Sequence, residues 1–314
     1  MFKKQLIPQA VIGILVTVFF VAVACSDKNK SVPTQSTTTA VQLSLSGLKP
    51  LENGINYQAW VVTSDYYAYP LGIFNFNKDG KMVDVSGDTL LSGKFTIDLG
   101  LDEIWYIGIS IEAQKVITET PSSTHILGGT VSDSQAVLTL DNVMGLGKSF
   151  QGATGKYILA TPTDSINTNE NSGIWFLDLT TGISFKGLNL PDPPSGWKYE
   201  GWVIADGTYL STGKFSQLTA ADDSAYYSGP VAGPPFPGED FLQNAPEGLS
   251  FPLNLAGASV MITLEPGEGY DDNPGKPFFL KVLVADIPPG AADRITYDMS
   301  ASSDSLPSGT AALK

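Results

Sequence analysis

An internal duplication constrains the fold of this chain more than any other feature. A tyrosine, a tryptophan three residues later and a glycine further on all occur twice. The two tyrosines and the two tryptophans are 142 positions apart and the two glycines 141, so the register holds to within one residue. Such a repeat indicates two related structural units. The matched positions are Tyr57, Trp60 and Gly72 in the first copy and Tyr199, Trp202 and Gly213 in the second.

Each copy has the pattern of a β-sandwich domain. Ile109–Glu112 corresponds to Ile262–Glu265, and Ile126–Leu127 to Val282–Leu283, so each copy spans roughly a hundred residues or more, a usual size for such a domain. Side chains alternate with period two through 57–62 and 199–204, as in strands. We expect an all-β fold of two tandem β-sandwich domains, at 41–145 and 155–289, and a C-terminal tail at 290–314.

The glycines, prolines and turn motifs of the chain agree with this expectation. Its 32 Gly and 21 Pro separate runs rich in Val, Ile, Thr, Tyr and Phe, which favour short strands. Asn77–Gly80 and Ala205–Gly207 carry Asp-Gly pairs typical of hairpin turns, and 156–163 and 173–178 are expected to be strands of the second domain. Trp60 and Trp202 are expected to anchor the cores, with a sugar-stacking surface as the alternative.

The first 25 residues predict export. Lys3 and Lys4 precede an apolar run from Ala10 to Ala24, which at 15 residues is short for a membrane-spanning helix, and Cys25 follows directly. The arrangement resembles the lipobox of bacterial lipoproteins. That resemblance implies a signal peptide at 1–24, which is removed, and acylation of Cys25 with diacylglycerol and a fatty acid such as palmitate. An ordinary secretory signal with an incidental cysteine is the alternative.

The same resemblance implies a lipid anchor in the bacterial cell envelope. Residues 25–40 hold the lipidated cysteine and a polar segment that has no aromatic residue, so we expect a flexible tether. Ser26 in place of Asp implies the outer membrane under the usual lipoprotein sorting rule. Without Lys3 and Lys4 the net charge is 16 − 32 = −16, which anionic headgroups repel, so the lipid on Cys25 is the expected membrane contact.

A second resemblance concerns the folded body. Several short motifs follow one another in the same order along the chain. They are Leu-x-Pro, Tyr-x-x-Trp-Val-Val/Ile, Gly-x-Phe, Ile262–Pro266 and Asn273–Pro277. This series resembles the extracytoplasmic domain of anti-sigma-K factors, here duplicated over about 41–141 and 156–289. The resemblance implies a β-sandwich. It does not imply sigma binding, because a chain that begins at a lipidated Cys25 has no cytoplasmic part.

The composition excludes several functions. The formal net charge of 18 − 32 = −14 argues against a nucleic-acid partner. One Cys and one His exclude a disulfide framework, Cys/His zinc sites and most nucleophile–histidine chemistry. His125 precedes a strand without any G-x-S-x-G motif, and we expect it at a loop or strand edge. Glu112 and Glu265 are expected to face solvent at strand ends. We therefore expect no catalytic residue, no cofactor and no enzyme.

Two loops contain candidate calcium ligands. Residues 164–173 alternate oxygen-bearing side chains, with Asp164, Asn167 and Asn169 as candidates, but the spacing is not that of an EF-hand. Asp271 and Asp272 form the second candidate. In both places a plain hairpin loop is the alternative, and it is the one we expect.

The largest difference between the copies is an insertion at 228–248. Its five prolines favour a stiff, extended loop, and it carries Phe236 and Phe241. Long loops on a rigid scaffold often bind ligands, so these two residues mark a candidate binding loop. The alternative, which we favour, is that the two rings fold back over an open sheet edge.

These features together predict a non-catalytic, lipid-anchored envelope protein that acts as a structural or interaction module, with an envelope protein or a glycan as partner. A carbohydrate-binding or carbohydrate-acting protein outside the cytoplasm is the alternative. A third hypothesis is an assembly subunit whose edge strands or segment 295–314 pair with a neighbour.

Overall fold

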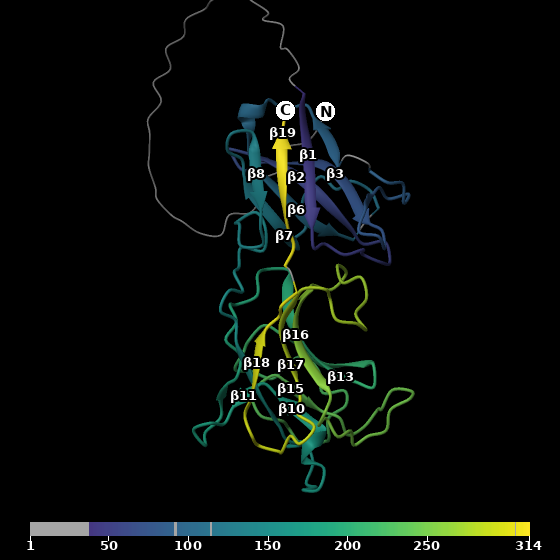
Figure 1. The fold of residues 1–314 in the computed structure, drawn as a ribbon, viewed down its shortest axis with the longest axis vertical. Helices are drawn as coiled ribbons and strands as arrows, with labels where there is room; N and C mark the ends of the chain where they lie inside the picture. Colours follow the sequence, from purple (N-terminus) through teal and green to yellow (C-terminus); the bar gives the residue numbers. More distant parts are fainter. Residues whose placement is uncertain (1–37, 91–92, 114, 305) are drawn as a thin grey trace, which may run out of the picture.

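The regular secondary structure of the described chain consists almost entirely of antiparallel β-strands, as predicted. The computed structural model describes residues 38–90, 93–113, 115–304 and 306–314. Figure 1 shows two β-domains stacked along the long axis of the molecule. The upper domain contains β1 (Thr39–Ser46), β2 (Asn56–Thr63), β3 (Ala68–Phe76), β4 (Met82–Val83), β5 (Lys94–Ile97), η1 (Leu101–Glu103), β6 (Ile104–Glu112), β7 (His125–Thr130), β8 (Gln135–Leu138) and β19 (Ser308–Leu313). The lower domain contains β9 (Gly155–Leu159), η2 (Glu170–Ser172), β10 (Gly173–Trp175), β11 (Leu177–Asp178), β12 (Phe185–Lys186), β13 (Trp197–Ala205), β14 (Thr208–Phe215), β15 (Gly238–Asp240), β16 (Ser259–Pro266), β17 (Lys281–Asp286) and β18 (Tyr297–Ala301).

Two sheets form the first domain. One has the strand order β5-β1-β19-β8 and the other the order β4-β3-β2-β6-β7. Inward-facing Val41 and Leu43 of β1 belong to the same buried core as Tyr57 of β2 and Ile109 of β6. A Cβ at Gly72 would lie 2.4 Å from the ring of Phe95, so only glycine lets β5 pack closely over β3.

One long sheet forms most of the second domain. Its eight strands run in the order β14-β13-β16-β17-β18-β9-β10-β15, and a small β11-β12 sheet accompanies it. The two end strands, β14 and β15, come into contact, so the sheet curls into a nearly closed barrel around its own apolar side chains. Curling removes most of the exposed edge that an eight-stranded sheet would otherwise present.

The predicted duplication is present in the strand pairing. In the first copy β2 pairs with β3 and β6, and β6 with β7, while in the second β13 pairs with β14 and β16, and β16 with β17. Ala59 faces Gly72 as Gly201 faces Gly213. Both copies have a register shift directly before the repeated tryptophan, in the β2–β3 and β13–β14 pairs, and another in the β6–β7 and β16–β17 pairs. These shifts lie at Ala59/Trp60 and Ile109/Ser110, and at Gly201/Trp202 and Ile262/Thr263.

The predicted turns and strands are also found. Asn77 and Gly80 are joined by a turn hydrogen bond, and Asp206 and Gly207 both have positive φ between β13 and β14, as a tight hairpin requires. Segment 156–163 begins with β9, and 173–178 contains β10 and β11.

The C-terminal segment 290–314 is not a tail. Its strand β18 joins the second domain, and β19 then returns to the first domain, where it lies between β1 and β8 (Figure 1). Val41 faces Leu313 and Ser46 faces Ser308 in the β1 ladder. The sequence Ser308–Leu313 is too rich in small residues to mark a core strand by itself, so its place is decided by the two strands that it joins.

Candidate functional site

Each domain contains a buried chain of hydrogen bonds that runs from its repeated tryptophan to a glutamate. In the first domain the indole Nε1 of Trp60 donates to Ser110 Oγ at 2.7 Å, and Ser110 donates to Glu112 Oε1 at 2.5 Å. The backbone N–H of Ser122 also donates to Glu112 Oε1, at 2.9 Å. In this way the carboxylate fixes the loop after β6 to the core tryptophan.

The second domain repeats this chain with a threonine in place of the serine. Trp202 Nε1 donates to Thr263 Oγ1 at 3.0 Å, the Thr263 hydroxyl donates to Glu265, and the Phe278 N–H donates to Glu265 Oε1 at 2.9 Å. Trp60 and Trp202 are therefore core residues, as predicted. The prediction that Glu112 and Glu265 face solvent is wrong, because their exposed fractions are 3% and 0%. The side chain of each glutamate points to the same face of its sheet as the tryptophan. Only the packing of the folded chain shows that this face is buried.

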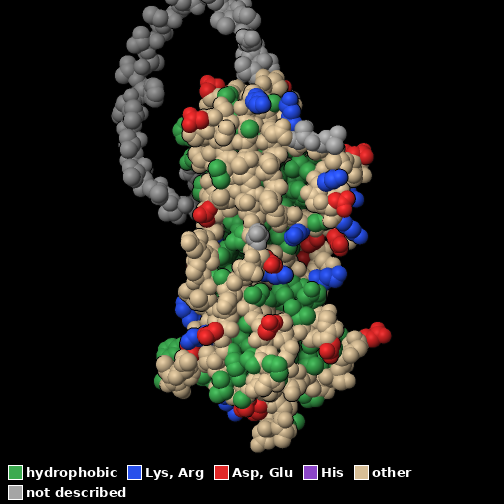
Figure 2. All heavy atoms as spheres, viewed as in Figure 1, with side chains coloured by type: hydrophobic (Ala, Val, Ile, Leu, Met, Phe, Trp, Pro, Cys, Tyr) green, Lys and Arg blue, Asp and Glu red, His purple; other side chains and the backbone are tan. Residues whose placement is uncertain are grey.

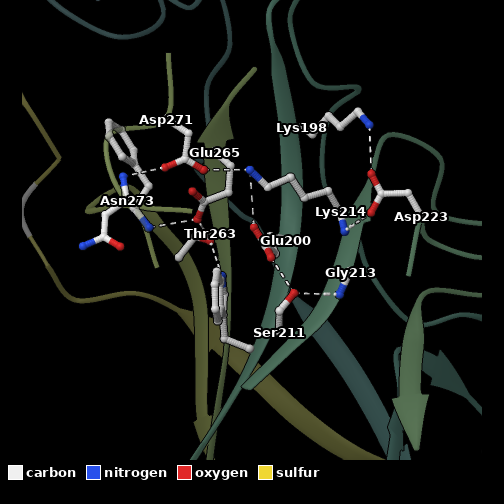
Figure 3. Close-up of polar contacts among 12 residues, drawn as sticks. Lys198, Glu200, Ser211, Gly213, Lys214, Asp223, Thr263, Glu265, Asp271 and Asn273 are labelled. Atoms are coloured by element: carbon white, nitrogen blue, oxygen red, sulfur yellow. Dashed lines mark hydrogen bonds and ion pairs between the residues drawn. The ribbon is translucent and has the colours of Figure 1, made fainter. Parts of the chain in front are cut away.

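The second copy adds charge to this network, as Figure 3 shows. Glu200 stands where the first copy has Gln58, and Lys214 where it has Ile73. Lys214 Nζ lies 2.8 Å from Asp271 Oδ2 and 3.7 Å from Glu200 Oε2. Glu200 Oε1 accepts from Ser211 Oγ at 2.5 Å, while Glu200 Oε2 has no hydrogen-bond donor. We call Glu200, Lys214, Glu265 and Asp271 the acid–lysine cluster.

Burial makes two acids of this cluster hold their protons at unusually high pH. Burial raises the pKa of the Glu200 carboxyl from its ordinary 4.5 to about 7, against the opposing effects of the Ser211 hydrogen bond and the Lys214 charge. Burial, with a smaller contribution from the nearby Glu200 charge, raises the pKa of Glu265 to about 8. The Oε2 atom of Glu265, like that of Glu200, has no donor. Two acids of this kind in low dielectric retain a proton near neutrality.

The acid–lysine cluster lies beside the contact between the domains. Asp272, next to Asp271, accepts a hydrogen bond from the Glu52 N–H at 2.9 Å. The Asn53 side chain donates to the Asp272 carbonyl at 2.7 Å. The loop 271–273 thus connects the cluster on one side to the first domain on the other.

Most of the candidate calcium ligands are used in hydrogen bonds and ion pairs of the protein itself. Asp164 accepts from the Ile166 N–H at 3.0 Å and from the Asn169 side chain at 2.8 Å, so its carboxylate stabilises its own loop. Asn167 lies in the same loop, beside a polar hollow. Asp271 and Asp272 are bonded as described above. Among the described residues no group of three or more His, Cys, Asp or Glu side chains is placed to hold a metal ion.

The insertion folds back on the second domain. Phe241 packs against Tyr227 and Phe251, with ring centroids 5.5 and 5.9 Å apart, and Phe236 is buried in a cluster with Trp175. Strand β15, inside the insertion, pairs with β10 and covers its edge. Both rings are buried, as the favoured alternative of rings folded back over a sheet edge predicted, so they are not available as the surface of a binding loop.

Acids of the insertion also hold it in place. Asp240 accepts from the Thr163 N–H at 2.8 Å and from Trp175 Nε1 at 2.9 Å. Burial raises the pKa of Glu239 and of Asp222 to about 7 each, despite hydrogen bonds that lower both values. These carboxyls join loop to strand within one domain.

Of the remaining residues singled out in the sequence, His125 is described by the structure and Cys25 is not. His125 begins β7, at a strand edge as expected, and burial lowers the pKa of its imidazole. Cys25, the predicted signal peptide and most of the predicted tether lie outside the described residues. Within the described residues no helix has the length and apolar character needed to cross a membrane.

Sequence reasoning missed one polar hollow. A space of about 460 Å³ is lined by Asn167, Asn169, Asn254 and Arg294, among others. Arg294, the single arginine of the chain, has φ of 55° and donates from Nη2 to both carboxylate oxygens of Glu170 at 3.1 and 3.2 Å. The rarity of arginine was the one signal that could have pointed to this place.

Comparisons of the chain with known protein families, with curated proteins and with solved structures found no match.

Proposed function

We propose that this chain is a non-catalytic protein of the bacterial cell envelope, held at the membrane by lipid on Cys25 and acting as a structural or interaction module. Lysines, an apolar run and small residues precede Cys25, in the order expected of a lipoprotein signal. The first strand begins at Thr39, so a short polar segment separates the proposed anchor from the folded body.

One observation carries the modular part of the proposal. The buried acids of both domains are bonded to groups of their own domain, where they connect strands to loops. Glu112 holds the Ser122 backbone, Glu265 the Phe278 backbone and Asp240 the Thr163 backbone. The repeated Trp–hydroxyl–Glu chain is used alike in both copies, which fits a scaffold role.

Replacement of Cys25 by Ala tests the anchor. We expect the wild-type chain, expressed in a bacterial host, to sediment with membranes and to carry acyl mass at its amino terminus. Cys25→Ala should remove both, because a lipid chain contributes about 0.8 kcal/mol for each buried methylene and the acidic body has no other attraction for anionic lipid. Ser26→Ala is the matched control and should stay membrane-bound. Retention of Cys25→Ala in the membrane fraction would contradict the proposal.

A carbohydrate-binding role outside the cytoplasm is the second candidate. It is compatible with the same anchored module. The observation that favours it is a single exposed tryptophan, Trp105, at the end of the first domain.

A further inference from the structure

Trp105 differs from every other tryptophan of the chain. The other four, Trp60, Trp175, Trp197 and Trp202, are at most 4% exposed, whereas Trp105 is 51% exposed. Trp105 is the second residue of β6, and its carbonyl accepts the Val131 N–H at 2.8 Å. The backbone of this residue is therefore held in a ladder while its large apolar ring stays in water. An exposed indole on a rigid strand is a typical anchor for a ligand.

Trp105 is one of the residues that line a hollow of about 390 Å³. Its volume lies within the ~300–1,000 Å³ usual for small-molecule sites. Buried Ile104 and half-buried Val131 contribute apolar surface to it. The polar part of its lining consists of Asp102, Thr130, Ser132, Asp133 and Ser134.

These polar side chains have unused hydrogen-bonding capacity. In the described part of the chain, none of the side chains of Asp102, Thr130, Ser132 or Asp133 bonds to another residue. Elsewhere exposed acids commonly cap their own loops, as Asp84 does with the N–H groups of Ser86 and Asp88. Carboxylates can accept, and hydroxyls can donate and accept, hydrogen bonds with a polyhydroxylated ligand in the hollow that they line together with Trp105.

The turn that carries two of these groups has an uncommon backbone. Ser132 and Gln135 pair through both backbone bonds, at 2.8 and 2.9 Å, and the two residues between them have positive φ, 51° at Asp133 and 60° at Ser134. A tight hairpin of this type prefers glycine or asparagine, so a serine here bears strain. Residues with a strained backbone are often found at functional sites, so this turn supports a functional role for the hollow.

The geometry points to a saccharide-binding site formed by Trp105, Asp102, Asp133 and the hydroxyls of Thr130 and Ser132. The apolar C–H face of a pyranose would stack on the Trp105 ring, whose π-face is negative, while the sugar hydroxyls bond to the carboxylates. This inference rests on the proposed interaction module and names the class of its partner.

Charge narrows the class of sugar. Two carboxylates and no Lys or Arg line the hollow, so uronic and other anionic sugars are repelled, and neutral or amino sugars fit. The same charge disfavours insertion of Trp105 into an anionic bilayer.

The site lies at the end of the first domain where the described chain begins. The Ser134 carbonyl accepts the Leu313 N–H, and Lys314 pairs with Ala40 next to the predicted tether. On the face seen in Figure 2, charged side chains are scattered among uncharged ones.

The test uses the full chain carrying Cys25→Ala, so that the lipid cannot influence binding. Tetramers of β-linked glucose and of β-linked N-acetylglucosamine are titrated up to about 10 mM, a range that covers the millimolar dissociation constants of weak sites. Binding is followed by calorimetry and by acrylamide quenching of Trp105, obtained as the difference from Trp105→Phe. We expect one tetramer to protect Trp105 from quenching and Trp105→Ala to weaken calorimetric binding at least tenfold.

Matched variants separate the site from general effects. Asp102→Asn and Asp133→Asn should each weaken binding severalfold, whereas Phe185→Ala, which removes another half-exposed ring in β12, should change nothing. The proposal is overturned if neither tetramer binds, if Trp105→Ala binds as well as the parent, or if oligogalacturonate binds more tightly than both. Trp105-dependent binding to phosphatidylcholine–phosphatidylglycerol vesicles without sugar binding would also overturn it, in favour of a membrane contact. Membrane fractionation of the lipidated chain is independent of these results, so the anchor can hold when the sugar site fails.

Discussion

Single residues explain why the two copies share a core yet differ electrostatically. Trp60 and Trp202 make the same bond to a hydroxyl, and that hydroxyl in turn bonds a buried glutamate. The exchange of Gln58 for Glu200 then places a second acid beside Glu265 in one copy only. Burial disfavours the charged form of each acid. The stability of the second copy therefore depends on pH, and two neighbouring buried acids make this dependence stronger than one would.

The sign of this dependence follows from the raised pKa values. Glu200 and Glu265 release their protons near pH 7 and 8 in the folded chain but near 4.5 when unfolded. The folded state therefore binds more protons between these limits. The stability from these protons is complete below about pH 4.5 and is lost as the pH rises through about 8.

Replacement of Glu200 by Gln should flatten this profile. The variant restores the residue of the first copy and retains an oxygen for the Ser211 hydroxyl, while Lys214 keeps Asp271 as its partner. We expect the melting temperature of the second domain to fall between about pH 5 and pH 8.5 in the parent and to fall by a smaller amount in Glu200→Gln, in which Glu265, Glu239 and Asp222 still titrate. Differential scanning calorimetry of both proteins at pH 5 and at pH 8.5 measures these melting temperatures. An equal fall in both proteins would show that Glu200 does not titrate in this range.

Among the elements, β19 has the largest effect for its length. It is hydrogen-bonded on both sides, to β1 through six residue pairs and to β8 through four. Only Ala311 and Leu313 of this strand are buried, so the backbone ladder supplies much of its attachment. The strand completes the sheet at its centre rather than at its edge.

Two substitutions on opposite faces of β19 test this placement. Ala311→Asp puts an unpaired carboxylate into the core and should lower the free energy of unfolding of the first domain by about 3 kcal/mol or more. Thr310→Asp, on the exposed face of the same strand, should change it by less than about 0.5 kcal/mol. Urea denaturation followed by circular dichroism gives both values. Similar losses in the two variants would mean that Ala311 does not face the core.

At the scale of the whole molecule, the first domain is made from both ends of the chain. The chain leaves this domain after β8, forms the second domain and returns as β19, so both described ends meet where Ala40 pairs with Lys314. The loop of Glu52 and Asn53 adds a direct contact to Asp272 of the second domain. Such closure makes the first domain depend on residues that follow the second.

A chain that ends at Ala301 tests this dependence. It should retain a folded second domain, whose β18 is intact, while the first domain lacks the strand between β1 and β8 and loses most of its stability. A synthetic peptide of residues 302–314, added in excess, should restore the first domain by binding the folded form alone. Amide hydrogen exchange reports each domain separately. Full protection of the first domain in the shortened chain, without peptide, would refute the dependence.

Local patterns predicted the parts of the fold that depend on neighbouring residues. Period-two alternation identified the strands around Trp60 and Trp202, and the Asp-Gly pair at Asp206 and Gly207 identified a hairpin. The candidate site was less accessible to such reasoning. Asp271 was only a candidate calcium ligand in an expected hairpin loop, but its carboxylate pairs with Lys214, whose side chain comes from a strand more than fifty residues away. No local pattern encodes that meeting.

The sequence alone determined an all-β chain with two matched copies, because strand alternation and turn geometry are properties of consecutive residues. The tertiary structure decided which side chains are buried and which strands meet. Glu112 and Glu265 became core acids, β19 became a central strand and Trp105 stayed exposed while four other tryptophans did not. These outcomes depend on contacts between residues far apart in the chain, and burial has no local signal of its own.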